Sequence, residues 1–143
     1  MHKKILVPVD GSEKSFKTLD CANLLVEKLG GKLIVLHVIQ QMENVQGIES
    51  SFVDDINKGR QAFSNYIMTR VKNHLGAVIL ARTEFMHIEA SSTSEAIVKV
   101  AKEKECDAII IGARGLDDTE TTTMGSVSTA VLNKTNLSVL VVK

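Results

Sequence analysis

Five short apolar runs punctuate the chain. They occupy residues 4–9, 32–39, 83–89, 107–111 and 137–142. Four of them are nearly continuous in Val, Ile and Leu, which is typical of strands covered on both faces of a parallel sheet. The third run, TEFMHIE, alternates apolar and polar residues, and this indicates a strand closer to the edge of the sheet.

Between these runs, apolar residues recur at spacings of three and four, the pattern of one buried helix face. The expected faces comprise, in order, Phe16, Leu19, Ala22, Val26 and Leu29; Phe52, Ile56, Phe63, Ile67 and Val71; Ile97, Val100 and Ala101; and Val127, Ala130 and Val131. Ser12 can cap the first helix, and the pair Gly30 and Gly31 can end it. The fourth helix is expected to begin at Gly125 and Ser126.

Strand and helix therefore alternate along the whole chain. This alternation predicts an α/β fold, a doubly wound five-stranded parallel sheet with helices on both faces. Ligands of such sheets bind outside the carboxyl ends of the strands, where the strand order reverses. The first strand ends near Pro8, Val9 and Asp10, the second at Val38, and the fourth at Gly112. We expect these strand ends to form one crevice if the first and fourth strands are neighbours.

Composition then narrows the class of function. The chain has 143 residues, which suits one domain over residues 1–143. Its 17 Lys and Arg residues balance 17 Asp and Glu residues, so the net charge favours neither nucleic acid nor an acidic membrane as partner. No apolar run approaches the roughly 18 residues of a membrane span. Cys21 and Cys106 stand outside any CxxC motif, and we expect free thiols and a cytoplasmic location.

Residues 112–128, GARGLDDTETTTMGSVS, are the main candidate for chemistry. They contain Gly112, Gly115 and Gly125, and Ser126 follows the last glycine. A helix that begins here presents free N–H groups and partial positive charge, which suits a phosphate. Alternatively, these glycines could be turn residues that bind no ligand. Neither G-x-x-x-x-G-K-[ST] nor G-x-G-x-x-G occurs, so the residues alone leave both interpretations open.

The spacing of these residues, Gly112-x2-Gly115-x9-Gly125-Ser126, resembles the signature of the universal stress protein family in its ATP-binding branch. The resemblance extends to KILVPVDGS at residues 4–12, LHVI at 36–39 and SVLVVK at 138–143. It implies a sheet ordered 3-2-1-4-5, with ATP held at the carboxyl ends of strands one, two and four. Residues 137–142 would then form an exposed apolar edge, and a homodimer through this strand is expected.

The resemblance also implies roles for individual residues. Asp10 would meet the ribose or the adenine, Pro8 and Val9 would shape the pocket wall, and Val38 would contact adenine through its backbone. The residues implied for the ribose and the phosphates are Gly112, Arg114, Gly115, Gly125, Ser126, Val127 and Ser128. The residue types agree with these roles, because a carboxylate accepts from ribose hydroxyls and a guanidinium attracts phosphate.

The spacer before Gly125, LDDTETTTM, departs from the family, where this segment is usually apolar with some basic residues. Asp117, Asp118 and Glu120 would repel a triphosphate unless a cation such as Mg²⁺ lay between them. A spacer that points into solvent would leave the site unaffected. No metal ligands can be assigned from the sequence, and whether Mg²⁺ accompanies ATP stays open.

We therefore expect an ATP-binding regulatory or stress-response module with little or no hydrolysis and an unidentified regulatory protein partner. No nucleophile has a recognisable base partner, so no catalytic residue is assigned. Two alternatives remain. One is the nucleotide-free branch of the family, which would act through protein contacts. The other is a slow ATPase or a self-phosphorylating protein that uses Ser126 or Ser128.

Overall fold

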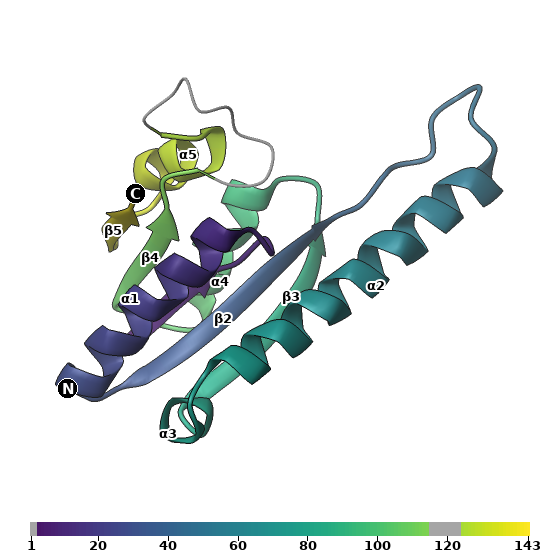
Figure 1. Ribbon diagram of the computed structural model, residues 1–143. Helices are drawn as coiled ribbons and strands as arrows, with labels where there is room; N and C mark the ends of the chain where they lie inside the picture. The colour runs from purple at the N-terminus through teal and green to yellow at the C-terminus, as the bar shows by residue number, and fades with distance from the viewer. Residues whose placement is uncertain (1–2, 115–123) are drawn as a thin grey trace.

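The computed structural model describes residues 3–114 and 124–143. Within these residues, the strands are β1 Lys4–Pro8, β2 Lys32–Gln40, β3 Thr83–Ala90, β4 Ala108–Gly112 and β5 Ser138–Val142. They form one five-stranded parallel sheet in the order β3-β2-β1-β4-β5 (Figure 1). The predicted fold class and strand order are therefore confirmed.

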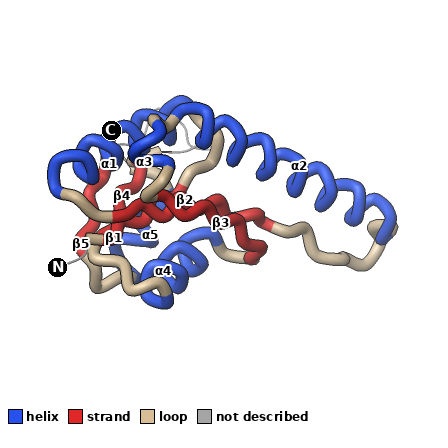
Figure 2. The backbone as a smooth tube through the Cα atoms, turned by 90° about the horizontal axis from the view of Figure 1, so that it is seen from below, coloured by secondary structure: helices blue, strands red, loops and turns tan. Residues whose placement is uncertain are grey.

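The helices cover the two faces of this sheet as the alternation predicts. Their bounds are α1 Glu13–Leu29, α2 Ser50–His74, α3 Ala77–Leu80, α4 Thr93–Glu103 and α5 Ser126–Lys134. Helices α1, α2 and α3 lie on one face, and α4 and α5 lie on the other (Figure 2). Helix α3 was not predicted from the sequence, because one helical turn is too short to show a periodic apolar pattern.

The central strand β1 contributes to a separate apolar core on each face. Val7 packs with the residues of α1 and α2, whereas its neighbour Leu6 packs with the residues of α4 and α5. Both side chains are fully buried. Successive residues of a strand point to opposite faces, so a strand covered on both faces must be apolar at every position. This explains the continuous run in the sequence.

The ends of α1 are fixed by the residues that the sequence suggests. The Ser12 hydroxyl accepts a hydrogen bond from the backbone N–H of Ser15 at 3.1 Å. At the other end, Gly30 has a φ of 71° and donates its backbone N–H to the carbonyl of Val26. Gly31 has a φ of 122°, and a Cβ at this position would lie 2.2 Å from the carbonyl oxygen of Lys3. The chain can therefore pass from α1 into β2 only with glycine at this position.

Three residues expected on buried helix faces are exposed instead. Phe52 and Leu29 are each 56% exposed, and Phe63 is 44% exposed. Leu29 is the last residue of α1, where the helix leaves the core. Helix α2 is longer than the sheet is deep, so its N-terminal half extends past the strands (Figure 1). Its buried residues are Val53, Ser64, Ile67, Met68 and Val71.

The two edges of the sheet differ from its centre. The alternating strand β3 forms one edge, as expected. Strand β5 forms the other edge, and the expectation that its continuous apolar run is covered on both faces is wrong. Leu140 of this edge strand is 45% exposed, so the face on which it lies is not fully covered here.

Two further expectations concern the thiols and the membrane. Cys21 is half-buried and Cys106 is buried, and both are free. Burial raises the pKa of the Cys106 thiol to about 11, which keeps this thiol protonated at neutral pH. In the portion of the chain that the structure describes, no helix combines the length and the apolar character that a membrane crossing requires.

Candidate functional site

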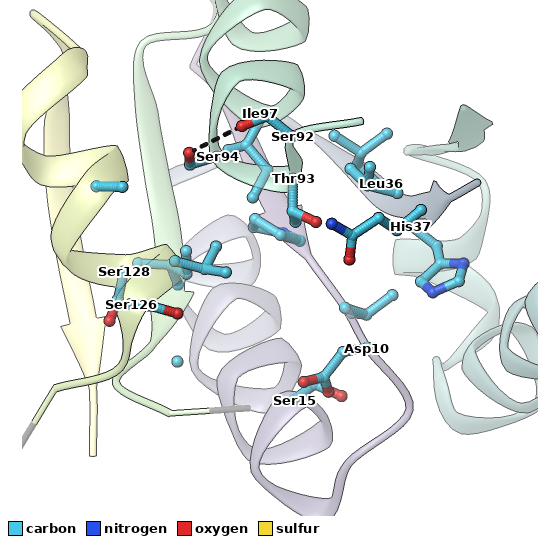
Figure 3. A pocket seen from close by; sticks show the side chains of 18 of the residues that line it. Asp10, Ser15, Leu36, His37, Ser92, Thr93, Ser94, Ile97, Ser126 and Ser128 are labelled. Carbon is cyan, nitrogen blue, oxygen red and sulfur yellow. Dashed lines mark hydrogen bonds between the residues drawn. The ribbon is translucent and has the colours of Figure 1, made fainter. Parts of the chain in front are cut away.

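A cavity of about 750 Å³ lies at the carboxyl ends of β1, β2 and β4. Its other walls are the starts of α4 and α5 and the middle of α2 (Figure 3). The predicted residues that line it are Pro8, Val9, Asp10, Val38, Gly112, Arg114, Ser126, Val127 and Ser128. Gly125 is the N-cap residue of α5 and does not line the cavity. Gly115 and the three carboxylates of the spacer lie outside the described residues.

The strand order explains why these residues meet. Strand β1 pairs with β2 on one side and with β4 on the other. After β1 the chain turns to one face of the sheet through α1, and after β4 it turns to the opposite face through α5. The two turns leave a crevice between β1 and β4 at which the strand order reverses, which is the usual ligand site of this architecture.

Asp10 is held at the mouth of this crevice by the turn that follows β1. Its Oδ1 accepts a hydrogen bond from the backbone N–H of Ser12 at 2.9 Å. Gly11, between them, has a φ of +86°, and a Cβ there would lie 3.0 Å from Cγ1 of Ile67. The turn therefore requires glycine for its conformation and for the close approach of α2. Asp10 is half-buried and lines the cavity (Figure 3).

Val38 lies where β2 runs past the end of β1. The last residue pair between these strands joins Pro8 to Leu36, and β2 continues to Gln40 beside β3 alone. The Leu36 carbonyl accepts from the N–H of Val9 at 2.8 Å, so the backbone of Leu36 faces β1. Because backbone groups alternate in direction along a strand, the N–H and C=O of Val38 face the same side, beyond the end of β1. A planar ligand can bind there as an additional strand would.

The start of α5 forms the opposite wall, and its two serines have different surroundings. Ser128 is 2% exposed, and its single hydroxyl hydrogen is shared between the carbonyls of Ala113 at 2.8 Å and Gly125 at 3.1 Å. Ser126 is exposed. The Ser128 hydroxyl therefore ties α5 to the end of β4, and only the backbone of Ser128 suits the expected role of phosphate donor. The first N–H groups of α5 have no partner within the helix and carry partial positive charge.

His37 connects the cavity wall to α2. Its Nδ1 lies 2.7 Å from the hydroxyl of Ser64, which is fully buried. Burial lowers the pKa of His37 because it disfavours the charged imidazolium, although the nearby carboxylate of Asp10 acts in the opposite direction. The hydrogen bond to Ser64 gives the buried imidazole of His37 a polar partner. Across residues 3–114 and 124–143, no three His, Cys, Asp or Glu side chains are grouped as they would be around a metal ion.

Two parts of the cavity were not predicted from the sequence. One is the middle of α2, which contributes Arg60 and Phe63, and the other is the turn of residues 91–94 before α4. Arg60 also donates a hydrogen bond to the carbonyl of Gln40 at the end of β2. The apolar pattern placed Phe63 on the buried face of α2. Only the position of α2 over the strand ends turns this ring toward the cavity.

Comparison with known proteins gives matches over the full length of the chain. The sequence model described as the universal stress protein family matches residues 1–143. The universal stress protein MJ0577 of Methanocaldococcus jannaschii is 32% identical over 166 residues, a match that covers 100% of this chain and 96% of the relative. The universal stress protein YxiE of Bacillus subtilis is 28% identical over 150 residues, with 100% of both chains covered.

Solved structures show the same fold. The universal stress protein UspA from Lactobacillus plantarum superposes with a TM-score of 0.86 at 21% identity, over 99% of this chain and 98% of that one. A universal stress protein in complex with cAMP gives a TM-score of 0.72 at 21% identity, over 99% and 96% of the two chains. One from Archaeoglobus fulgidus in complex with dAMP gives 0.65 at 19%, over 100% and 98%. Because the sequence model of the family spans residues 1–143, the chain belongs to the universal stress protein family.

Proposed function

We propose that this chain binds an adenine nucleotide, ATP by preference, in the cavity at the ends of β1, β2 and β4. It would act in the cytoplasm as a regulatory module in the stress response. A protein partner would distinguish its nucleotide-bound form from its nucleotide-free form. The observation that carries the proposal is the convergence of a carboxylate, a free strand edge and a helix start on one cavity of about 750 Å³. Cavities of roughly 300–1,000 Å³ are usual for small-molecule ligands.

Each wall of the cavity suits one part of the nucleotide. The backbone of Val38 offers a donor and an acceptor to the edge of adenine, as a neighbouring strand would. Pro8 and Val9 supply an apolar wall, and Asp10 can accept hydrogen bonds from ribose hydroxyls. The phosphates would lie at the start of α5, beside Gly112 and Arg114, and the family resemblance also assigns Gly115 to the phosphates. These roles assign the base and the phosphates to different walls of the cavity.

The start of α5 supports phosphate binding in more detail. Gly125 precedes the helix, and the N–H groups of Ser126, Val127 and Ser128 are the donors that a helix leaves free at its first turn. Ser126 adds an exposed hydroxyl. A Mg²⁺ ion bound to the phosphates would neutralise part of their charge, and it would matter most if the acidic spacer lies near them. Two structurally similar proteins, in complexes with cAMP and dAMP, make an adenine nucleotide the ligand to test first.

Equilibrium dialysis with labelled ATP, with and without Mg²⁺, tests this proposal. We expect wild-type protein to bind ATP, and the Asp10→Asn variant to bind it roughly tenfold to a hundredfold more weakly, because one charge-assisted hydrogen bond is lost. Asp54→Asn is the matched control: it makes the same change at an exposed position of α2 that does not line the cavity. Equal affinities of the two variants, or no binding at millimolar ATP, would contradict the proposal.

The same samples separate the alternatives. If no nucleotide copurifies with the protein and no added nucleotide binds, the result would favour the branch of the family that acts through protein contacts. A self-phosphorylating protein would transfer label from γ-labelled ATP to Ser126, since the Ser128 hydroxyl is buried and donates to two carbonyls. Label that stays on ATP would exclude both hydrolysis and self-phosphorylation.

A further inference from the structure

One aromatic ring lies on the cavity wall although it belongs to none of the strand ends or glycine turns. Phe63 of α2 lines the cavity and is 44% exposed. Among the described residues that line the cavity, it is the only Phe or Tyr. Phe and Tyr together number five in the whole chain, and Trp is absent. A half-exposed ring that faces a cavity is available to a ligand.

The ring of Phe63 is held in place from two sides. A Cβ on Gly11 would lie 3.3 Å from its Cζ, so the ring packs directly on the glycine of the turn after β1. On the other side, the rings of His37 and Phe63 meet edge to face, with centroids 6.4 Å apart and an interplanar angle of 81°. Figure 3 shows His37 at one side of the cavity, with its imidazole directed away from Ser126 and Ser128. These two contacts limit the positions that the ring can take.

The two residues that fix the ring are direct neighbours of residues proposed to bind the nucleotide. Gly11 follows Asp10, and His37 precedes Val38. The hydrogen bond between His37 and Ser64 ties the same turn of α2 to β2. A base held by the backbone of Val38 and a ribose held by Asp10 would thus share the cavity with this aromatic ring. Planar bases bind such surfaces by stacking or by edge contacts.

We propose that Phe63 contacts the nucleotide base and contributes to affinity through the base alone, which makes α2 part of the binding site. This proposal rests on the proposed function. The glycine turns and helix start recognise phosphates, which all nucleotides share. Phe63 would supply recognition of the aromatic base, because every base has a π-face that can contact a ring.

Isothermal titration of ATP into wild-type protein and three variants tests the role of the ring. Phe63→Leu keeps apolar bulk but removes the ring, whereas Phe63→Tyr keeps the ring. Phe52→Leu is the matched control, since Phe52 is 56% exposed on the same helix and does not line the cavity. Removal of an aromatic partner typically weakens base binding about fivefold to a hundredfold. We expect a loss in this range for Phe63→Leu and an affinity within twofold of wild type for Phe52→Leu. Phe63→Tyr should lose less than Phe63→Leu, because it keeps the ring and adds only a hydroxyl at Cζ, the atom that packs on Gly11.

A second readout separates contact with the ligand from a structural role. With five Phe and Tyr residues in the chain, ring resonances can be assigned by comparison of wild-type and variant NMR spectra. ATP should shift the Phe63 ring resonances and leave those of Phe52 unchanged. Thermal unfolding of each variant should show that the fold is retained.

The outcomes are distinct. If wild-type protein binds no ATP, the proposed function and this inference both fail. If wild-type binds ATP and Phe63→Leu binds equally well, only the inference fails. It also fails if Phe63→Tyr loses as much affinity as Phe63→Leu, or if Phe52→Leu loses as much, because the effect would then not depend on a ring at the cavity.

Discussion

At the scale of single residues, two glycines on the same face of the sheet have opposite surroundings. Gly31 joins α1 to β2 with a φ of +122° and no room for a side chain. Gly59 lies within α2, and a Cβ there would meet no heavy atom within 4 Å. Glycine is therefore required at the first position, and at the second it only adds conformational freedom to the unfolded chain.

This contrast predicts opposite effects of one substitution. Gly31→Ala should lower the free energy of unfolding by about 2 kcal/mol or more, because it adds backbone strain and a clash with the Lys3 carbonyl. Gly59→Ala should raise it by about 0.5–1 kcal/mol, since alanine is the better helix former. Urea unfolding monitored by circular dichroism measures both values. A similar change in both variants would show that the surroundings of Gly31 do not decide its role.

At the scale of elements, α5 depends on a side-chain bond to β4. The Ser128 hydroxyl donates to Ala113 and Gly125, the residues just after β4 and just before α5. Ser128→Ala removes both bonds and should lower the free energy of unfolding by about 1 kcal/mol. Ser126→Ala, at an exposed position of the same helical turn, should leave stability within about 0.5 kcal/mol of wild type. Thermal or urea unfolding distinguishes the pair, and equal stability of the two variants would rule out this role for Ser128.

The elements also show what the sequence could and could not predict. The strand order and the meeting of Asp10, Val38 and Gly112 were predictable, because parallel strands bring their carboxyl ends to one edge. The exposure of Phe63 was not. A helical period indicates which residues share a face of the helix. Whether that face packs on the sheet or lines the cavity depends on where α2 lies.

The existence of the short helix α3 and the position of residues 91–94 beside the cavity could not be predicted from the sequence, for a related reason. Four residues carry no measurable period. Ser92, Thr93 and Ser94 are candidate caps of the helix that follows, but their residue types do not indicate a cavity wall. Ser92 does cap α4, by accepting from the N–H of Glu95. Ser92 lies beside the cavity because of the order of the strands, and no local sequence pattern indicates this position.

At the scale of the whole molecule, the edge strand β5 predicts self-association. The Ala113 N–H donates to the carbonyl of Val142, so alternation directs the backbone of Val141 away from β4. We expect a homodimer in which β5 pairs with β5 of a second copy. Val141→Pro removes an outward N–H without loss of a bond to β4, and it should convert the dimer to a monomer. Sedimentation at micromolar concentration measures this.

Val141→Thr serves as the control, because it keeps the N–H and the β-branched shape and should remain dimeric. A wild-type protein that sediments as a monomer would refute dimerisation through this edge. A Val141→Pro variant that remains dimeric would place the interface elsewhere on the molecule.

The central place of β1 also has a consequence for synthesis on the ribosome. The backbone N–H of Lys4 bonds to the side chain of Asp107, 103 residues later, and β1 pairs with β4 along one side. At about 5–20 residues per second, the ribosome needs roughly 4–14 s to extend the chain from the end of β2 to the end of β4. For those seconds the backbone groups along one edge of the first strand have no partner strand, and an unpaired edge can pair with another chain. Chaperone protection of the nascent protein would matter most in this interval.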